Sequence, residues 1–174
     1  ITSTGGVQEF GRKWARNDYP LQALWEMGAR LAKVPDIDLI QDESRERMQK
    51  LAAVGHHFVV TCVGMPKKKA LSDVNLKNVG VSAFEVNLTA QRFEQAAENL
   101  AAIRHEHGVK IYYAKLLTAD PSQYDGTHFS HVVRAGFELD ELDGYIEVIT
   151  QAVKDGVIDG ITVRVDSTQC LRAA

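Results

Sequence analysis

Three stretches of the chain share one pattern: an amphipathic helix ends at a glycine, and an apolar run follows directly. The glycines are Gly55, Gly108 and Gly156, and the runs after them are HHFVVTCV, VKIYYAKLL and VIDGITVRV. A glycine at a helix end takes the left-handed conformation that closes the helix. A short apolar run is typical of a strand buried on both faces, as in a parallel sheet. The pattern therefore predicts an α/β fold of parallel strands alternating with helices.

The same periodicities give approximate bounds for the elements. Apolar residues at helical spacing predict a helix over 20–34 that Pro35 ends, and a second helix that begins near Asp42. Thr89 is placed to cap a third, long helix. Acidic residues crowd the start of a final helix, where the helix dipole favours negative charge. The predicted strands cover 57–63, 79–88, 109–117 and 160–165.

Four segments, VVTCVG, SAFEVNL, VKIYYAKLL and GITVRVD, each stand next to a predicted helix. Over most of residues 42–166 this succession resembles consecutive units of a (β/α)-barrel of the TIM type, a partial TIM-barrel-like fold. The resemblance is architectural. It implies a site at the carboxyl ends of the strands, often one for a phosphorylated or sugar-like molecule. The alternative is a five-stranded, flavodoxin-like open sheet, although that fold usually carries a phosphate-binding loop after its first strand.

Composition narrows the class of protein. The chain has 174 residues, of which 45% are hydrophobic and 25% charged, as expected for a single soluble α/β domain. Its net charge of -3 gives no reason to expect nucleic acid or an anionic membrane as a partner. No apolar stretch approaches the roughly 20 residues that span a bilayer. Two cysteines without disulfide or metal spacing, Cys62 and Cys170, favour a cytoplasmic setting.

The length indicates a fragment of a longer chain. An eight-unit barrel typically takes about 250 residues, whereas this chain has room for about five strands. An open part of a barrel leaves strand edges unpaired, and unpaired edges promote association. We therefore expect the sheet edges to pair with the rest of a parent chain or with a second copy.

Glu85 is the sharpest candidate for a functional residue. It stands two positions before Asn87, a substrate-binding candidate, in the apolar strand SAFEVNL, so both side chains point to one face. A carboxylate in an apolar strand is costly unless it is paired or faces a polar cavity, such as an active-site mouth. The alternative is a buried ion pair with Lys115 or Arg164 that serves the structure alone.

Other polar residues stand near predicted strand ends or in the long loop before the last helix. Lys115 occupies a position typical of a Schiff-base or phosphate-binding lysine. Arg164 and Asp166 share one face and are candidates for orienting a substrate. His128 and His131 are spaced to share a metal ion on a helical turn, with a carboxylate as a third ligand. A divalent metal ion is thus a candidate cofactor.

Two further segments have the composition of an anion site, but such segments more often form solvated surface. The loop TSTGG offers backbone amides without the lysine of a P-loop. Lys67, Lys68 and Lys69 offer three cations on a polar connection. Neither segment matches a nucleotide-binding fingerprint.

Two functions follow from these candidates. The first is a barrel-type hydrolase, lyase or isomerase for a small polar substrate of the sugar- or phosphate-bearing kind. In it, Glu85 is the general base or a metal ligand, Lys115 stabilises an oxyanion or binds phosphate, and His131 is an acid/base or a metal ligand. This hypothesis requires Glu85, Lys115, His131 and Asp166 to converge in one cavity. The alternative is a non-catalytic accessory or interaction domain of a larger protein, such as a phosphoesterase.

Overall fold

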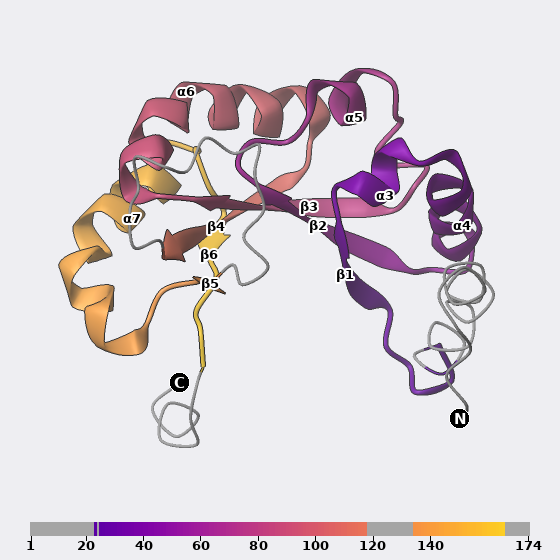
Figure 1. Cartoon of the computed structure of the whole chain (residues 1–174), viewed down its shortest axis with the longest axis horizontal. Helices are drawn as coiled ribbons and strands as arrows, with labels where there is room; N and C mark the ends of the chain where they lie inside the picture. The colour runs from indigo at the N-terminus through magenta and orange to yellow at the C-terminus, as the bar shows by residue number, and fades with distance from the viewer. Residues whose placement is uncertain (1–22, 24, 118–133, 166–174) are drawn as a thin grey trace, which may run out of the picture.

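A curved parallel sheet forms the centre of the molecule in the computed structural model, which describes residues 23, 25–117 and 134–165 (Figure 1). In this part of the chain five strands run parallel, and the short β5 pairs antiparallel with β4. The strands are β1 (Leu31–Pro35), β2 (His57–Val63), β3 (Val81–Leu88), β4 (Lys110–Leu117), β5 (Arg134–Ala135) and β6 (Gly160–Ile161).

Helices connect the parallel strands, as the sequence pattern predicts. The helices are α3 (Ile37–Ile40), α4 (Asp42–Ala53), α5 (Lys68–Ser72), α6 (Ala90–His107), the 3₁₀ helix η2 (Leu139–Gly144) and α7 (Ile146–Lys154). No described helix combines the length and the apolar character needed to cross a bilayer.

The order of the strands in the sheet is their order in the sequence. β1, β2, β3 and β4 are successive neighbours, and β6 pairs with β4. Right-handed crossovers between parallel strands in this order place every connecting helix on one face. Figure 1 shows α4, α6 and α7 around one side of the curved sheet. The α/β prediction is confirmed, and the sequential order favours the barrel-like arrangement, because a flavodoxin-like sheet reverses its order and carries helices on both faces.

The hydrophobic core lies between the sheet and these helices. Alternate residues of the strands, such as Val60, Phe84 and Ile111, are fully buried there. Phe93 of α6 stacks on Tyr113 of β4 with ring centroids 4.0 Å apart. The helices also contribute Met48, Leu100 and Ala152 to this core. One face of the sheet therefore packs against the helices.

Helix α6 has the two ends that the sequence predicts. The Thr89 hydroxyl accepts a hydrogen bond from the backbone N–H of Arg92 at 3.4 Å, which caps the first turn. Gly108 at the other end has a φ of 62° in the left-handed region, which favours glycine. Strand β4 follows two residues later, so local signals fix this helix-to-strand junction.

The predicted helix over 20–34 is wrong at its carboxyl end. Leu31 begins β1, which pairs with β2, and its side chain is 63% exposed rather than part of a helical core face. Gly28, with a φ of 78°, precedes the strand. Apolar residues three or four apart fit a helix, but they do not exclude a strand. Here pairing with β2 outweighs the local pattern.

The final helix and the final strand also differ from the elements that the sequence predicts. The acidic segment forms η2 before α7 begins, and Glu138 and Glu141 close its first turn in a reciprocal capping box. The predicted strand over 160–165 is shorter, because β6 ends at Ile161 and only Val163 adds an isolated bridge, to Phe137.

Arg104 and Asp159 join the end of α6 to the segment that precedes β6. The guanidinium donates to both carboxylate oxygens, at 2.9 and 2.8 Å, and Asp159 Oδ2 also accepts the backbone N–H of Ile111 at 2.9 Å. The hydrogen bonds from Arg104 hold the pKa of Asp159 below its ordinary value of 3.8.

We expect Asp159→Asn to lower the free energy of unfolding at neutral pH by about 1 kcal/mol, since Arg104 is partly exposed and solvent screens the pair. Folding lowers the pKa of Asp159, so its carboxylate stabilises the fold at every pH above the ordinary pKa of 3.8. This contribution is lost as the pH falls through the lower pKa of the folded state. Urea unfolding from neutral to acidic pH should therefore show a smaller acid-induced loss in the variant. Glu46→Gln, which breaks an exposed pair with Lys50, is the control and should leave the neutral-pH midpoint unchanged. Equal effects of the two substitutions would contradict this account.

Candidate functional site

A cluster of polar side chains occupies the face of the sheet opposite the helices. Strand alternation and register place Thr61, Glu85 and Tyr112 on this face, because Glu85 is paired with Thr61 of β2 and with Tyr112 of β4. We call this the concave face. Its polar cluster consists of Lys33, Thr61, Glu85, Asn87 and Thr162, joined by one ion pair and several hydrogen bonds.

Glu85 is the centre of the cluster. Its side chain is 8% exposed, and Lys33 Nζ lies 2.5 Å from Oε1. The Thr61 hydroxyl is 3.2 Å from the same oxygen, and the Thr162 hydroxyl donates to Oε2 at 2.9 Å. Both carboxylate oxygens therefore have donors, and a cation compensates the buried charge.

Asn87 orients one of these donors. Its Nδ2 donates to Thr61 Oγ1 at 3.0 Å and to the carbonyl oxygen of Cys62 at 2.9 Å. With a lone pair of Thr61 engaged in this way, the hydroxyl proton is directed to Glu85. The result is a chain of hydrogen bonds from amide to hydroxyl to carboxylate, and it holds the carboxylate in place.

The contacts of Glu85 cross more than one strand. Thr162 follows β6, and β4 lies between it and Glu85 on β3. Neighbouring strands are about 4.8 Å apart, so the side chains of Thr162 and Glu85 can meet across the intervening strand only if the sheet curves toward them. The small Ala114 of β4, paired in register with Asn87, leaves room at this level. The curvature thus brings together groups that are far apart in the sequence.

The cluster combines a carboxylate, an ammonium group and hydroxyl and amide groups. Glu85 can accept or return a proton, and Lys33 can stabilise negative charge on an oxygen. The Lys33 side chain is 52% exposed, so a solvent-borne molecule can reach it. Hydroxyl and carboxamide groups match the hydroxyl groups of a polyol.

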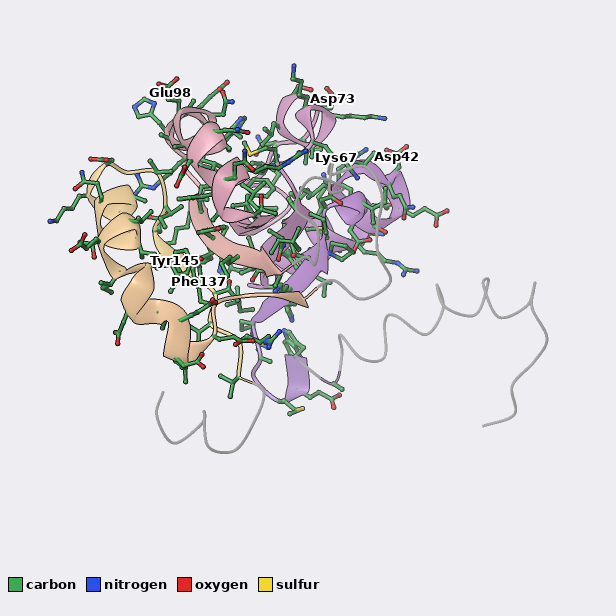
Figure 2. All side chains as sticks on the ribbon, turned by 60° about the vertical axis from the view of Figure 1, so that its left-hand side comes forward. Asp42, Lys67, Asp73, Glu98, Phe137 and Tyr145 are labelled. Carbon is green, nitrogen blue, oxygen red and sulfur yellow. The ribbon has the colours of Figure 1, made fainter. Side chains whose placement is uncertain are left out.

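Lys115 does not join this cluster. Three positions separate it from Tyr112, so it points to the helix face of the sheet. There it pairs with Glu141 of η2, and its ammonium lies 4.7 Å from the ring centroid of Tyr145 and 5.8 Å from that of Phe137. Figure 2 shows Phe137 and Tyr145 side by side.

Arg164 belongs to the same group of charges as Lys115. It pairs with Glu138, whose backbone N–H donates to Glu141 Oε1 at 2.9 Å. Burial acts to raise the pKa of Glu141, but the Lys115 hydrogen bond, the Glu138 N–H and the nearby cations outweigh it and hold the pKa below its ordinary range. Neither cation is paired with Glu85, so the predicted structural ion pair is replaced by the pair with Lys33.

The remaining predicted residues, His128, His131 and Asp166, lie outside the described residues, as does the loop TSTGG. The metal site predicted from them therefore stays a prediction. Within 25–117 and 134–165 no group of three histidine, cysteine or acidic side chains is placed to hold a metal ion.

Sequence reasoning missed Lys33, Thr61 and Thr162. Lys33 lies in a segment for which the sequence predicts a helix, and this prediction gives no indication that the residue belongs to a strand paired with β2. Thr61 and Thr162 are polar residues within apolar strand segments, HFVVTCV and GITVRV, and that contrast was the available signal. It is the same signal that singled out Glu85.

Comparison with known proteins adds no assignment, because no family model, curated protein or solved structure matches this chain.

We expect Lys33→Met to destabilise the fold by about 2 kcal/mol, because it leaves the carboxylate of Glu85 buried without its cation. Lys33→Met combined with Glu85→Gln should recover most of this loss, since the neutral amide needs no cation. The measurement is a double-mutant cycle by urea unfolding. Additive effects of the two substitutions would show that the pair is not coupled.

Proposed function

We propose that the concave face is the active site of a barrel-type enzyme that performs acid–base chemistry on a small polar substrate with a sugar-like carbon chain. The observation that carries the proposal is the buried carboxylate of Glu85, held by Lys33 and two threonine hydroxyls on the face opposite the described helices. Lys33 compensates this charge, but a buried ion pair generally stabilises a fold no more than well-packed apolar residues do. Catalysis gives a reason for keeping it there.

Glu85 is the proposed general base. It would take a proton from a carbon next to a carbonyl group, and Lys33 would stabilise the negative charge that develops on the carbonyl oxygen. Return of the proton to the former carbonyl carbon, with transfer of a proton from the adjacent hydroxyl to the former carbonyl oxygen, gives an isomerase. Expulsion of a leaving group from the carbon β to the carbonyl, which takes up the electron pair of the abstracted C–H bond, gives a lyase. Thr61, Thr162 and Asn87 would orient the hydroxyl groups of the substrate. Hydrolysis with a metal ion at His128 and His131 is the further variant of this proposal.

A second candidate function, the interaction domain, is favoured by the surface of α7. Ile146, Val148 and Val153 of this helix are between 44% and 55% exposed. Exposed apolar side chains gathered on one helix suit a protein partner. A cytoplasmic setting suits either function. The free, buried thiol of Cys62 fits such a reducing compartment.

The test is exchange of carbon-bound hydrogen. The protein is incubated in D₂O with a panel of aldoses, ketoses and their phosphate esters, and incorporation of deuterium is followed by NMR. We expect Glu85→Gln to lower the exchange rate by about a hundredfold or more, the size typical of losing a general base. Lys33→Met should lower the turnover number more than it raises the Michaelis constant, because it acts on the developing charge.

The controls are Glu98→Gln and Lys77→Met, which make the same changes at exposed positions of α6 and of the connection before β3. Both should keep the parent rate. Exchange that persists in Glu85→Gln would remove Glu85 as the base. Absence of exchange across the panel would overturn the proposed reaction. If Glu85→Gln were then also more stable than the parent protein, the carboxylate would serve a purpose other than stability, but not this reaction.

A further inference from the structure

A pocket of about 350 Å³ lies at the carboxyl ends of β2 and β3, beside α6. Val63 and Leu88, the last residues of the two strands, form part of its apolar wall. This volume is at the small end of the range for small-molecule sites. The pocket shares no lining residue with the polar cluster around Glu85, so it is a separate feature of the molecule.

The polar lining of the pocket is basic. Arg92, Gln95 and Asn99 line it from α6, where spacings of three and four residues place them along one side of the helix. Lys67 lines it from the connection between β2 and α5. Figure 2 shows Lys67 between α6 and the helices of the N-terminal part. The lining thus holds two cations and two carboxamides, and no carboxylate.

Lys67 is distinguished from its two neighbours by this position. Lys68 and Lys69 belong to α5, are exposed and do not line the pocket. Lys67 Nζ lies 3.2 Å from Asp36 Oδ2, in the segment that follows β1. This carboxylate holds the ammonium at the strand ends and also competes with any anion for it. All three lysines are therefore exposed, and of the three only Lys67 lines the pocket.

We propose that this pocket binds the phosphate group of a small phosphate monoester. A dianion matches two cations, and the carboxamide N–H groups of Gln95 and Asn99 add neutral donors to the phosphate oxygens. The apolar wall accommodates the short carbon chain of the ester. Binding rests on the side chains along α6 and on Lys67, and it does not depend on the reaction proposed for Glu85.

The test is calorimetric titration of the full chain at physiological ionic strength with inorganic phosphate and with glycerol phosphate. We expect one saturable site, with Lys67→Ala weakening binding about tenfold or more, the size of a lost charge-assisted hydrogen bond. Lys68→Ala removes the same charge from the adjacent residue and should change the affinity less than about twofold, because exposed charges are screened at this distance.

Two neutral-to-charged changes test the pocket without removing a cation. Asn99→Asp adds a negative charge at an exposed position of the lining and should weaken binding about tenfold, whereas Asn78→Asp, the same change in the connection before β3, should not. Asp36→Asn should strengthen binding, because it releases Lys67 from its competing carboxylate. A purely structural role of Lys67 predicts no such gain.

Equal effects of Lys67→Ala and Lys68→Ala would overturn the proposal, since they would indicate diffuse attraction of anions to a basic surface. Absence of saturable binding to either probe would also overturn it. Glu85→Gln should bind both probes like the parent protein, so failure of the phosphate site and failure of the proposed reaction are distinguishable.

Discussion

The handedness of parallel crossovers is the constraint on which the rest of the structure depends. Because the strands follow one another in sequence order, right-handed connections place the helices on a single face. That face takes the apolar residues, and the stacking of Phe93 on Tyr113 belongs to it. Within the described residues, the opposite face carries no helix and can hold polar groups. Glu85 lies on this second face, so its position follows from topology together with strand alternation.

The polar cluster around Glu85 is built on strands rather than on loops. Its donors come from β1, from β2 and from the segment after β6, and each reaches the carboxylate on β3. Groups on neighbouring strands are held by the backbone ladder, so their geometry is fixed before any ligand arrives. Lys33 is the exception, because its long side chain is half exposed and can change partner. A buried carboxylate beside a half-exposed ammonium group suits the proposed reaction site, in which contacts would be exchanged with a substrate.

How much of this was predictable from the sequence depended on the range of the interactions. Helix α6 and the junction at Gly108 rest on a cap and a left-handed glycine, which are local. Strand β1 is defined by pairing with β2, and no local signal outweighed the helical spacing around Leu31. The side of the sheet that Lys115 occupies depends on register, since Glu85 is paired with Tyr112. A shift of one residue would have put Lys115 on the concave face, and sequence alone does not set that register.

The charges at the strand ends form two groups, and this division separates their roles. Lys115, on the helix face, pairs with Glu141, and Arg164 pairs with Glu138, which ties η2 to the sheet. These cations are thereby engaged within the protein. On the concave face the donors converge on one carboxylate instead. The pocket beside α6 lies at the ends of β2 and β3, and β3 carries both Glu85 and Leu88, roughly 10 Å apart at the usual rise of a strand. A single rigid strand therefore sets the spacing between the proposed reaction site and the proposed phosphate site, and changes in side chains at one need not disturb the other.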